Sequence, residues 1–293
     1  MTSLSAQDTL FRGRQTLRCP GGSVLDLSRP QVMGILNVTP DSFFAGSRLE
    51  DEDELLRRAE QMLAAGAAVL DVGGYSSRPG ADDISPDEEL RRVLPAVTAI
   101  RRRFPEVFLS IDTFRARVAD AAVQAGANMI NDIGGGLLDA EMFPTVARLQ
   151  VPYVLMHMRG TPQTMTQLTS YDEDLLLTLT RFFRDQLTAL RALWPGADVV
   201  LDPGIGFAKT PAQSYELLRR LPELRTVLDL PLLVGLSRKT LVWKPLGLSP
   251  DAALPGTIAL NTLAVLGGAS LVRVHDVAEA VQTVRLIENT LSS

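Results

Sequence analysis

The stretch that decides the fold lies at residues 199–209, Val-Val-Leu-Asp-Pro-Gly-Ile-Gly-Phe-Ala-Lys. A short apolar run from Val199 to Leu201 ends on the carboxylate of Asp202, and a proline and two glycines follow before a helical pattern begins near Pro211. Such a run is typical of a strand buried on both faces in a parallel sheet. Glycines just past a strand let the backbone come close to a ligand. The stretch therefore predicts a buried strand that ends at a candidate binding loop.

The same arrangement recurs along the whole chain. Apolar runs predict strands at residues 32–37, 68–72, 107–111, 129–130, 153–156, 199–201, 232–236 and 271–274. Helical patterns follow them at residues 51–65, 86–103, 115–125, 140–149, 172–193, 212–221, 257–266 and 277–291. This alternation predicts an α/β protein with a (β/α)8 TIM barrel. A doubly wound open sheet is the structural alternative.

The N-terminal part adds a predicted β-hairpin. Residues 15–19 and 23–27 are joined by Pro20-Gly21-Gly22, which is a typical hairpin connection. In a barrel protein such a hairpin would close the bottom. The 293 residues contain no low-complexity linker or break in composition. We therefore predict a single domain over residues 1–293, with residues 1–30 as a hairpin extension.

Composition excludes several classes of function. A net charge of −5 leaves no basic face for a nucleic acid. No apolar run approaches the roughly 20 residues of a bilayer-spanning helix, so we expect no membrane partner. The first 15 residues carry charges and no apolar core, so a signal peptide is not indicated. Cys19 is the only cysteine, which excludes an internal disulfide and favours the cytoplasm.

Polar side chains gather where the predicted strands end. They are Asn37, Asp71, Asp112, Asn131, His157, Asp202, Ser237, Lys239, Arg273 and His275. In a barrel the carboxyl ends of the strands meet at the face where active sites form. A single Asp or Asn there is explained by the polarity of turns. The whole set, which includes both histidines of the chain, predicts a site for a polar heterocycle and an anionic group.

One half of this predicted site suits the heterocycle. Asp112, Asn131 and Asp202 offer carboxylate and amide acceptors for a flat edge rich in donors, such as a guanidine-like pyrimidine. Lys239 can donate to a ring carbonyl or nitrogen beside them, although a solvated lysine is the simpler alternative.

The other half suits the anion. Arg273 and His275 are two residues apart, so they lie on the same side of a strand, and arginine is a natural partner for phosphate. Asn37 could ligate Mg²⁺ beside a phosphate through its side-chain oxygen. The alternative for His275 is that it only braces the start of a helix.

Eight segments in order resemble dihydropteroate synthase, of the pterin-binding barrel superfamily. They are Gly34-Ile-Leu-Asn-Val-Thr-Pro-Asp-Ser-Phe43, Gly73-Gly-Tyr-Ser-Ser-Arg-Pro-Gly80, Ile111-Asp-Thr113, Asn131-Asp-Ile-Gly134, Leu155-Met-His-Met-Arg-Gly-Thr-Pro-Gln-Thr-Met165, Leu201-Asp-Pro-Gly-Ile-Gly-Phe-Ala-Lys209, Gly235-Leu-Ser-Arg-Lys239 and Arg273-Val-His-Asp276. Any one of them is moderately specific, and the ordered set is very specific.

The resemblance implies a transferase of folate biosynthesis. This family joins 6-hydroxymethyl-7,8-dihydropterin diphosphate to p-aminobenzoate with Mg²⁺ present, and it releases 7,8-dihydropteroate and pyrophosphate. Because an arylamine is a weak nucleophile, we expect an SN1-like displacement in which stabilising the leaving pyrophosphate lowers the barrier. The resemblance also implies a cytoplasmic homodimer and a target of sulfonamides.

The resemblance assigns roles to residues of this chain. It implies catalytic roles for Phe43, Lys239, Arg273 and His275. It implies pterin binding by Asp112, Asn131, Met156, Asp202, Gly206, Phe207, Gly235 and Lys239. It implies p-aminobenzoate binding by Ser77, Arg78, Pro79 and Ser237. The diphosphate would be bound by Asn37, Arg273 and His275, with Asn37 as the ligand of Mg²⁺.

The chain departs from the family pattern in two loops. The first loop usually reads Ser-Phe-Ser-Asp-Gly, and here Ala45 stands at the position of the aspartate. The second loop has Tyr75 where a glutamate is usual and Ser77 where a threonine is usual. We expect a functional but slower enzyme, or one in which Glu50 or Asp51 replaces the missing acid.

Three other functions compete with this interpretation. A pterin-dependent methyltransferase shares the barrel and the pterin-edge residues, and it would prefer a methyl-folate to a diphosphate ester. A relative could bind pterin without catalysis. A phosphate-binding barrel without pterin specificity is hard to reconcile with Asp112, Asn131 and Asp202 together.

Overall fold

Eight parallel strands form the central sheet of the computed structural model, which describes residues 15–19, 22–39, 48–78 and 82–292. The strands are β3 (Gln31–Asn37), β4 (Val69–Gly73), β5 (Phe108–Asp112), β6 (Met129–Asp132), β7 (Tyr153–Met156), β8 (Val199–Asp202), β9 (Leu233–Gly235) and β10 (Leu271–Val274). Their order is β8-β7-β6-β5-β4-β3-β10-β9, and a parallel bridge between Leu201 and Leu232 joins the two ends of the sheet. The sheet is thus a nearly closed barrel, which confirms the predicted (β/α)8 fold and contradicts the open-sheet alternative.

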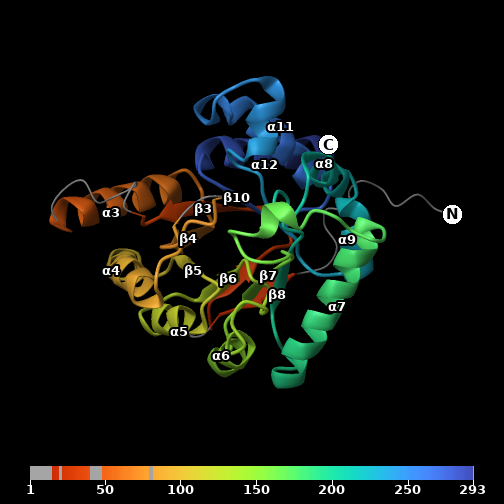
Figure 1. The fold of residues 1–293 in the computed structure, drawn as a ribbon. Coiled ribbons are helices and arrows are strands. Elements are labelled where there is room, and N and C mark those ends of the chain that lie inside the picture. The colour runs from red at the N-terminus through yellow and green to blue at the C-terminus, as the bar shows by residue number, and fades with distance from the viewer. Residues whose placement is uncertain (1–14, 20–21, 40–47, 79–81, 293) are drawn as a thin grey trace.

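Helices surround this barrel (Figure 1). They are α3 (Arg48–Ala64), α4 (Pro86–Arg103), α5 (Ala116–Gln124), α6 (Met142–Leu149), α7 (Leu175–Leu193), α8 (Pro211–Arg219), α9 (Leu221–Leu228), α10 (Thr240–Trp243), α11 (Leu254–Leu266) and α12 (Val277–Ser292). The main hydrophobic core lies between the outward-facing side chains of the strands and these helices. Within the described ranges, we find no helix that combines the length and the apolar character needed to cross a bilayer.

Local capping explains where several helices begin. Helix α4 spans the predicted residues, because the Ser85 side chain accepts a hydrogen bond from the Glu88 N–H at 3.2 Å and Pro86 occupies the first turn. Helix α7 begins later than predicted, because Asp174 accepts from the Leu177 N–H at 3.0 Å and caps the helix there. Caps rather than hydrophobic periodicity set these boundaries.

The helix predicted at residues 212–221 is present as α8, but the helix α9 that follows it was not predicted. The structure has two helices there, α8 and α9, which meet at Arg220. Pro222 lies in the first turn of α9, where its missing N–H costs no hydrogen bond. A proline in that position starts a new helix instead of continuing the old one.

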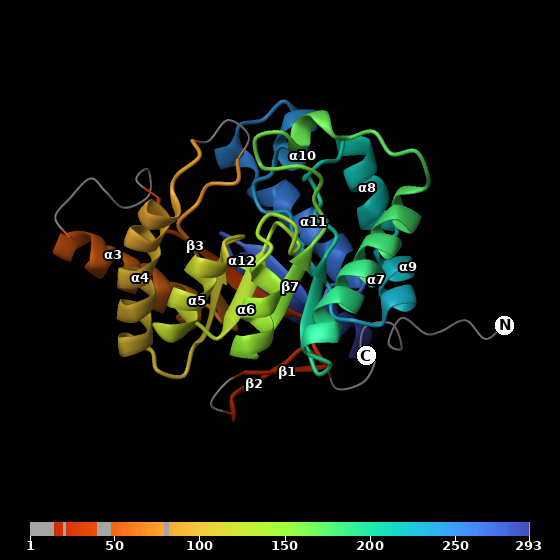
Figure 2. The same ribbon diagram turned by 60° about the horizontal axis from the view of Figure 1, so that its bottom comes forward.

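The N-terminal hairpin closes the bottom of the barrel, as predicted (Figure 2). Strands β1 (Thr16–Arg18) and β2 (Val24–Asp26) pair antiparallel, with Leu17 opposite Leu25. Leu17 and Leu25 point to one face and are buried in a separate apolar cluster. The other members of this cluster include Leu27, Met33, Val69, Met129, Val154, Val200, Leu233 and Leu271. The hairpin therefore seals the amino ends of the strands.

We expect Leu25→Ala to lower the free energy of unfolding by about 2–5 kcal/mol, because it removes a leucine side chain from this packed cluster. Val24→Ala on the same strand is the matched control, since Val24 is 51% exposed and Leu25 only 5%. Urea unfolding of both variants measures the difference. Equal losses in the two variants would contradict the sealing role of the hairpin.

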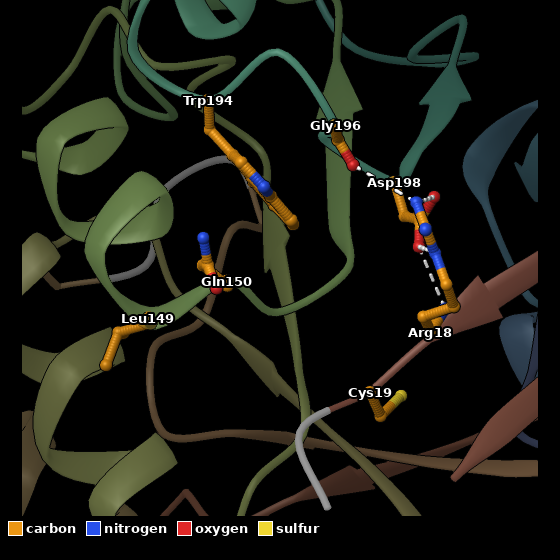
Figure 3. Close-up of a pocket in the computed structure, with 7 residues that line it drawn as sticks. All are labelled: Arg18, Cys19, Leu149, Gln150, Trp194, Gly196 and Asp198. Atoms are coloured by element: carbon orange, nitrogen blue, oxygen red, sulfur yellow. Dashed lines mark hydrogen bonds and ion pairs between the residues drawn. The ribbon is translucent and has the colours of Figure 1, made fainter. Parts of the chain in front are cut away.

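A cavity of about 380 Å³ lies beside the hairpin at the amino ends of the strands (Figure 3). It is lined by Arg18, Cys19, Leu149, Gln150, Trp194, Gly196 and Asp198. Arg18 Nε donates to Asp198 Oδ2 at 3.0 Å, which ties the hairpin to the start of β8. Burial raises the pKa of the Cys19 thiol to about 12, so the thiol stays protonated. This cavity lies at the opposite end of the barrel from the polar strand ends.

Candidate active site

The carboxyl ends of neighbouring strands bring the predicted polar residues together. The register places Gly73 of β4 beside Asp112 of β5, and Asp112 beside Asn131 of β6. Asp202 at the end of β8 pairs in register with Met156 of β7. Short parallel strands that end together therefore place an amide, two carboxylates and a methionine along one edge of the barrel.

An arginine joins the acids on this edge. Arg273 donates from Nε to Asp71 Oδ2 and from Nη2 to Asp112 Oδ2, each at 2.6 Å. Asn131 Nδ2 donates to the same Asp71 oxygen at 3.0 Å. Asp71 is fully buried. Asp71 was predicted at a strand end without a role, but it lies in the middle of β4 and forms the centre of this network.

The protonation of Asp112 and Arg273 depends on their burial and on their contact with each other. Burial raises the pKa of Asp112 above its ordinary value, and the Arg273 guanidinium opposes this rise. Burial alone would lower the pKa of Arg273, but Asp71 and Asp112 raise it by more. Arg273 therefore stays charged and holds two acidic side chains close together.

Lys239 follows β9 and lies close enough to Asp202 and Arg273 to interact with both charges. Its Nζ donates to the Ile205 carbonyl oxygen at 2.5 Å and lies 4.5 Å from the centroid of the Phe207 ring. Burial lowers the pKa of Lys239 to about 8, and Asp202 opposes this change. Burial raises the pKa of Asp202, against the opposing charge of Lys239 and a hydrogen bond from the Gly204 N–H at 2.7 Å. The alternative of a solvated Lys239 is wrong.

Two glycines, Gly206 and Gly235, lie next to the Lys239 side chain and leave room for it. Gly206 has a φ of +83°, and a Cβ there would lie 3.3 Å from Lys239 Cδ. A Cβ on Gly235 would lie 4.0 Å from Lys239 Nζ. A side chain at Gly206 would therefore be strained and would crowd the lysine.

An apolar cluster borders these polar groups. It consists of Ile133, Met156, Met158, Met165 and Ala208, with Phe114, Leu138 and Phe207 packed against it. Met156 and Phe207, which the resemblance assigns to the faces of the ring, therefore belong to one cluster. Such a wall with a few converging polar groups suits a flat heterocycle.

His275 is held by Ser237. The Ser237 hydroxyl accepts from the His275 backbone N–H at 3.2 Å and lies 3.0 Å from its Nδ1. Burial lowers the pKa of His275 to about 4, helped by Arg273. The imidazole is therefore neutral near pH 7. The Ser237 hydroxyl can donate to Nδ1, and this arrangement would place the ring proton on Nε2. Of Arg273 and His275, only Arg273 is therefore a cation near pH 7.

The remaining predicted residues lie on or near this edge, or outside the described ranges. Asn37 Oδ1 lies 3.6 Å from the position that a Cβ on Gly73 would take. Ser77 is half-buried and Arg78 is exposed, both in the connection after β4. Phe43, Ala45 and Pro79 lie outside the residues that the structure describes.

The structure adds a contact that the sequence did not predict. The Tyr75 hydroxyl accepts a hydrogen bond from Gln163 Nε2 at 2.6 Å, and its ring packs edge-on against Phe114 with centroids 5.0 Å apart. Tyr75 therefore links the connection after β4 to the connection after β7. The departure of Tyr75 from the family pattern signals an unusual residue, but no local pattern indicates its partner.

Comparison with known proteins agrees with this geometry. Residues 33–275 match the family model described as pterin binding enzyme. Dihydropteroate synthase of Escherichia coli K12 is 42% identical over 273 residues, which is 93% of this chain and 95% of that protein. The chain therefore belongs to the dihydropteroate synthase family of pterin-binding enzymes.

Solved structures of the family are similar over nearly the whole chain. The Yersinia pestis dihydropteroate synthase in complex with a sulfonamide drug has a TM-score of 0.86 and 43% identity, covering 95% of this chain and all of that one. The Xanthomonas albilineans enzyme with 4-aminobenzoic acid has a TM-score of 0.87 and 38% identity, covering 96% of this chain and all of that one.

Proposed function

We propose that this chain is a transferase of folate biosynthesis that joins 6-hydroxymethyl-7,8-dihydropterin diphosphate to p-aminobenzoate, with 7,8-dihydropteroate and pyrophosphate as products. The observation that carries the proposal is that Asp112, Asn131 and Asp202 come together with Lys239 at the carboxyl ends of the strands, beside an apolar cluster. The likeness to dihydropteroate synthases over most of the chain supports it.

In this proposal the heterocycle lies between these polar groups and the apolar cluster. Asp112, Asn131 and Asp202 accept or donate along its polar edge, and Lys239 donates to its carbonyl side. Met156 and Phe207 cover its faces, while Gly206 and Gly235 leave room for the lysine. A site built from buried polar groups discriminates strongly, because a ligand that lacks the matching groups leaves them unpaired.

The diphosphate would lie beside Arg273, His275 and Asn37. Arg273 uses Nε and Nη2 for the two carboxylates, which leaves Nη1 for a phosphate oxygen. His275 would donate from Nε2, since Ser237 holds its Nδ1. For p-aminobenzoate we propose Ser77, Arg78, Pro79 and Ser237; Arg78 is close enough to His275 to lower its pKa.

The donor set fits Mg²⁺ only together with a diphosphate. Asn37 offers one amide oxygen, and the described residues contain no group of three or more His, Cys, Asp or Glu placed to hold a metal. Mg²⁺ commonly completes its shell with water and phosphate oxygens, so one protein ligand suffices. When bound there, the ion would neutralise charge on the departing pyrophosphate.

The residues of the chain would favour departure of pyrophosphate before attack by the amine. The amine of p-aminobenzoate is a weak nucleophile, and the dihydropterin can spread positive charge from its methylene carbon through the ring. Arg273 and the Nε2–H of His275 would stabilise the leaving negative charge without a covalent intermediate. The apolar cluster around Met156 would keep water from the cation.

The activity should fall as the pH rises past about 8. The Lys239 ammonium is present below its pKa of about 8 and is lost above it, so kcat/KM for the dihydropterin diphosphate should decrease there. In Lys239→Arg the guanidinium keeps its proton, so the decrease should move to higher pH even though turnover falls. Exposed Lys244 gives the control variant Lys244→Arg. If activity in Lys239→Arg decreased at the same pH as in the unaltered protein, Lys239 would not be the group whose titration limits activity.

Competition with a sulfonamide tests the proposed function. The drug should raise the KM for p-aminobenzoate without changing kcat, and it should not compete with the dihydropterin diphosphate. Competition against the pterin substrate alone would argue against the proposed p-aminobenzoate site. The methyltransferase alternative is tested by comparing the binding of the diphosphate ester with that of a methyl-folate, where tighter binding of the methyl-folate would favour that alternative.

We also propose a single-domain, cytoplasmic homodimer over residues 1–293, with residues 1–30 as its hairpin extension. Helix α11 supports the dimer, because it exposes Leu263 and Leu266 to solvent at 53% and 47%. Two large apolar side chains one turn apart are suited to an interface. The single cysteine supports the location.

A further inference from the structure

Two lysines, Lys209 and Lys239, donate hydrogen bonds to the backbone of the turn after β8. Its backbone takes positive φ at Gly204 (+65°), Gly206 (+83°) and Ala208 (+48°). The Ile205 carbonyl oxygen accepts a hydrogen bond from Lys239. The carbonyl oxygens on either side of Ile205 accept from a different lysine, Lys209, which the proposed function does not use.

Lys209 is buried in a cage of acceptors. Its Nζ lies 3.0 Å from the Gly204 and Phe207 carbonyl oxygens, 3.0 Å from His157 Nδ1 and 3.3 Å from the His157 carbonyl oxygen. The side chain is only 7% exposed. Four acceptors around one point match a compact ammonium better than a planar guanidinium. The chain has only three lysines, and two of them hold this turn, whereas its other basic residues are arginines.

The charges around Lys209 are few. Burial lowers its pKa to about 7, Asp202 opposes this change and Lys239 adds to it. His157 faces it from the end of β7 as a neutral ring, since burial lowers the pKa of His157 to about 2. Above pH 7 the neutral amine still has two N–H groups for the carbonyl oxygens.

The hydrogen bonds of Lys209 connect the turn to His157 at the end of β7. A Cβ on Gly204 would lie 2.0 Å from the His157 carbonyl oxygen, so the two backbones meet directly. Lys209 Nζ donates hydrogen bonds to the carbonyl oxygens of Gly204 and His157, one on each side of this contact. Without its ammonium, the acceptors would be left buried and unpaired, and the turn would have to move to hydrate them.

We propose that Lys209 is a positioning residue that acts through the turn of residues 204–208. It fixes the Phe207 ring and the Ile205 carbonyl, and these two groups fix Lys239 against the heterocycle. The inference rests on the proposed function, because Phe207 and Lys239 matter only if a pterin binds between them. The predicted consequence is specific for one substrate: a displaced turn weakens the pterin site and leaves the p-aminobenzoate site, formed by other connections, unchanged.

The test is the steady-state kinetics of Lys209→Met, which keeps the length of the side chain and removes its donors. Below pH 7, where the ammonium form prevails in the unaltered protein, the KM for dihydropterin diphosphate should rise about tenfold or more. The KM for p-aminobenzoate should change less than about twofold, by the same conversion of free energy to affinity. Lys244→Met, at an exposed lysine, is the matched control. An unchanged pterin KM in Lys209→Met would overturn the inference.

Chemical rescue provides the second variant. Lys209→Ala leaves room for a small cation, so added ammonium or methylammonium chloride should lower the pterin KM toward its original value, while sodium chloride should not. Absence of rescue, or failure of both Lys209 variants to fold, would overturn the inference, since Lys209 would then support the fold rather than the turn. Absence of turnover in the unaltered protein would overturn the proposed function itself.

Discussion

Arg273→Met is expected to abolish measurable turnover and to lower the free energy of unfolding by about 3–5 kcal/mol, the usual cost of removing one partner from a buried ion pair. The reason is the buried Asp71, which would lose its 2.6 Å contact with Arg273 Nε, while Asp112 would lose its contact with Nη2. Arg273 lowers the pKa of Asp112, so without this cation the Asp112 carboxyl group would bind a proton more readily. The stability difference from the unaltered protein should therefore narrow as the pH falls.

Arg238→Met is the control for this prediction. Arg238 also pairs with a carboxylate, Asp276, at 2.5 Å, but its side chain is 43% exposed and that of Arg273 is 20% exposed. The loss in stability from Arg238→Met should stay within about 1 kcal/mol. Urea unfolding at two pH values measures both variants. Similar losses for the two arginines would mean that the network around Asp71 contributes little to the barrel.

Asp202→Asn is expected to raise the KM for dihydropterin diphosphate about tenfold to a hundredfold, because a charged acceptor is replaced by a group that can donate. Asp202 is buried at the end of β8, and its charge raises the pKa values of Lys209 and Lys239. Removing that charge should lower both pKa values. The decrease of activity at high pH should therefore begin at a lower pH than in the unaltered protein.

Asp198→Asn provides the matched control at the other end of the same strand. Asp198 precedes β8 at the bottom of the barrel, where it pairs with Arg18. Its replacement should leave the KM for both substrates and the pH profile unchanged. If Asp198→Asn and Asp202→Asn had the same kinetic effect, the change would reflect damage to the strand rather than loss of a contact to the pterin.

The architecture was predictable because it depends on local patterns. Short apolar runs that end on polar residues gave the strands, and β7 and β10 have the predicted bounds. Caps such as Ser85 fixed helix starts. Helix α9 was missed, because it is short and because Pro222 in its first turn indicates the end of a helix when only the sequence is considered. Boundaries that depend on one residue are harder to predict than elements that depend on ten.

The site was predictable only as a set of residues at strand ends. The set included Asp71 and His157, but which side chains pair depends on contacts between residues far apart in the chain. Arg273 and Asp71 are separated by 202 positions, and Lys209 and His157 by 52. No periodicity or motif spacing records such pairs. For the same reason the neutral state of His275 follows from burial and from Arg273, and not from its sequence neighbours.

The central claim is that the site formed by the carboxylates and Lys239 catalyses the formation of dihydropteroate, and turnover tests it most directly. Purified protein is incubated with Mg²⁺, the dihydropterin diphosphate and p-aminobenzoate, and dihydropteroate is followed by chromatography, with Lys239→Ala as the control. We predict product from the unaltered chain at a rate far above that of Lys239→Ala. Tight binding of the diphosphate ester without any product, or equal rates in the two proteins, would contradict the account.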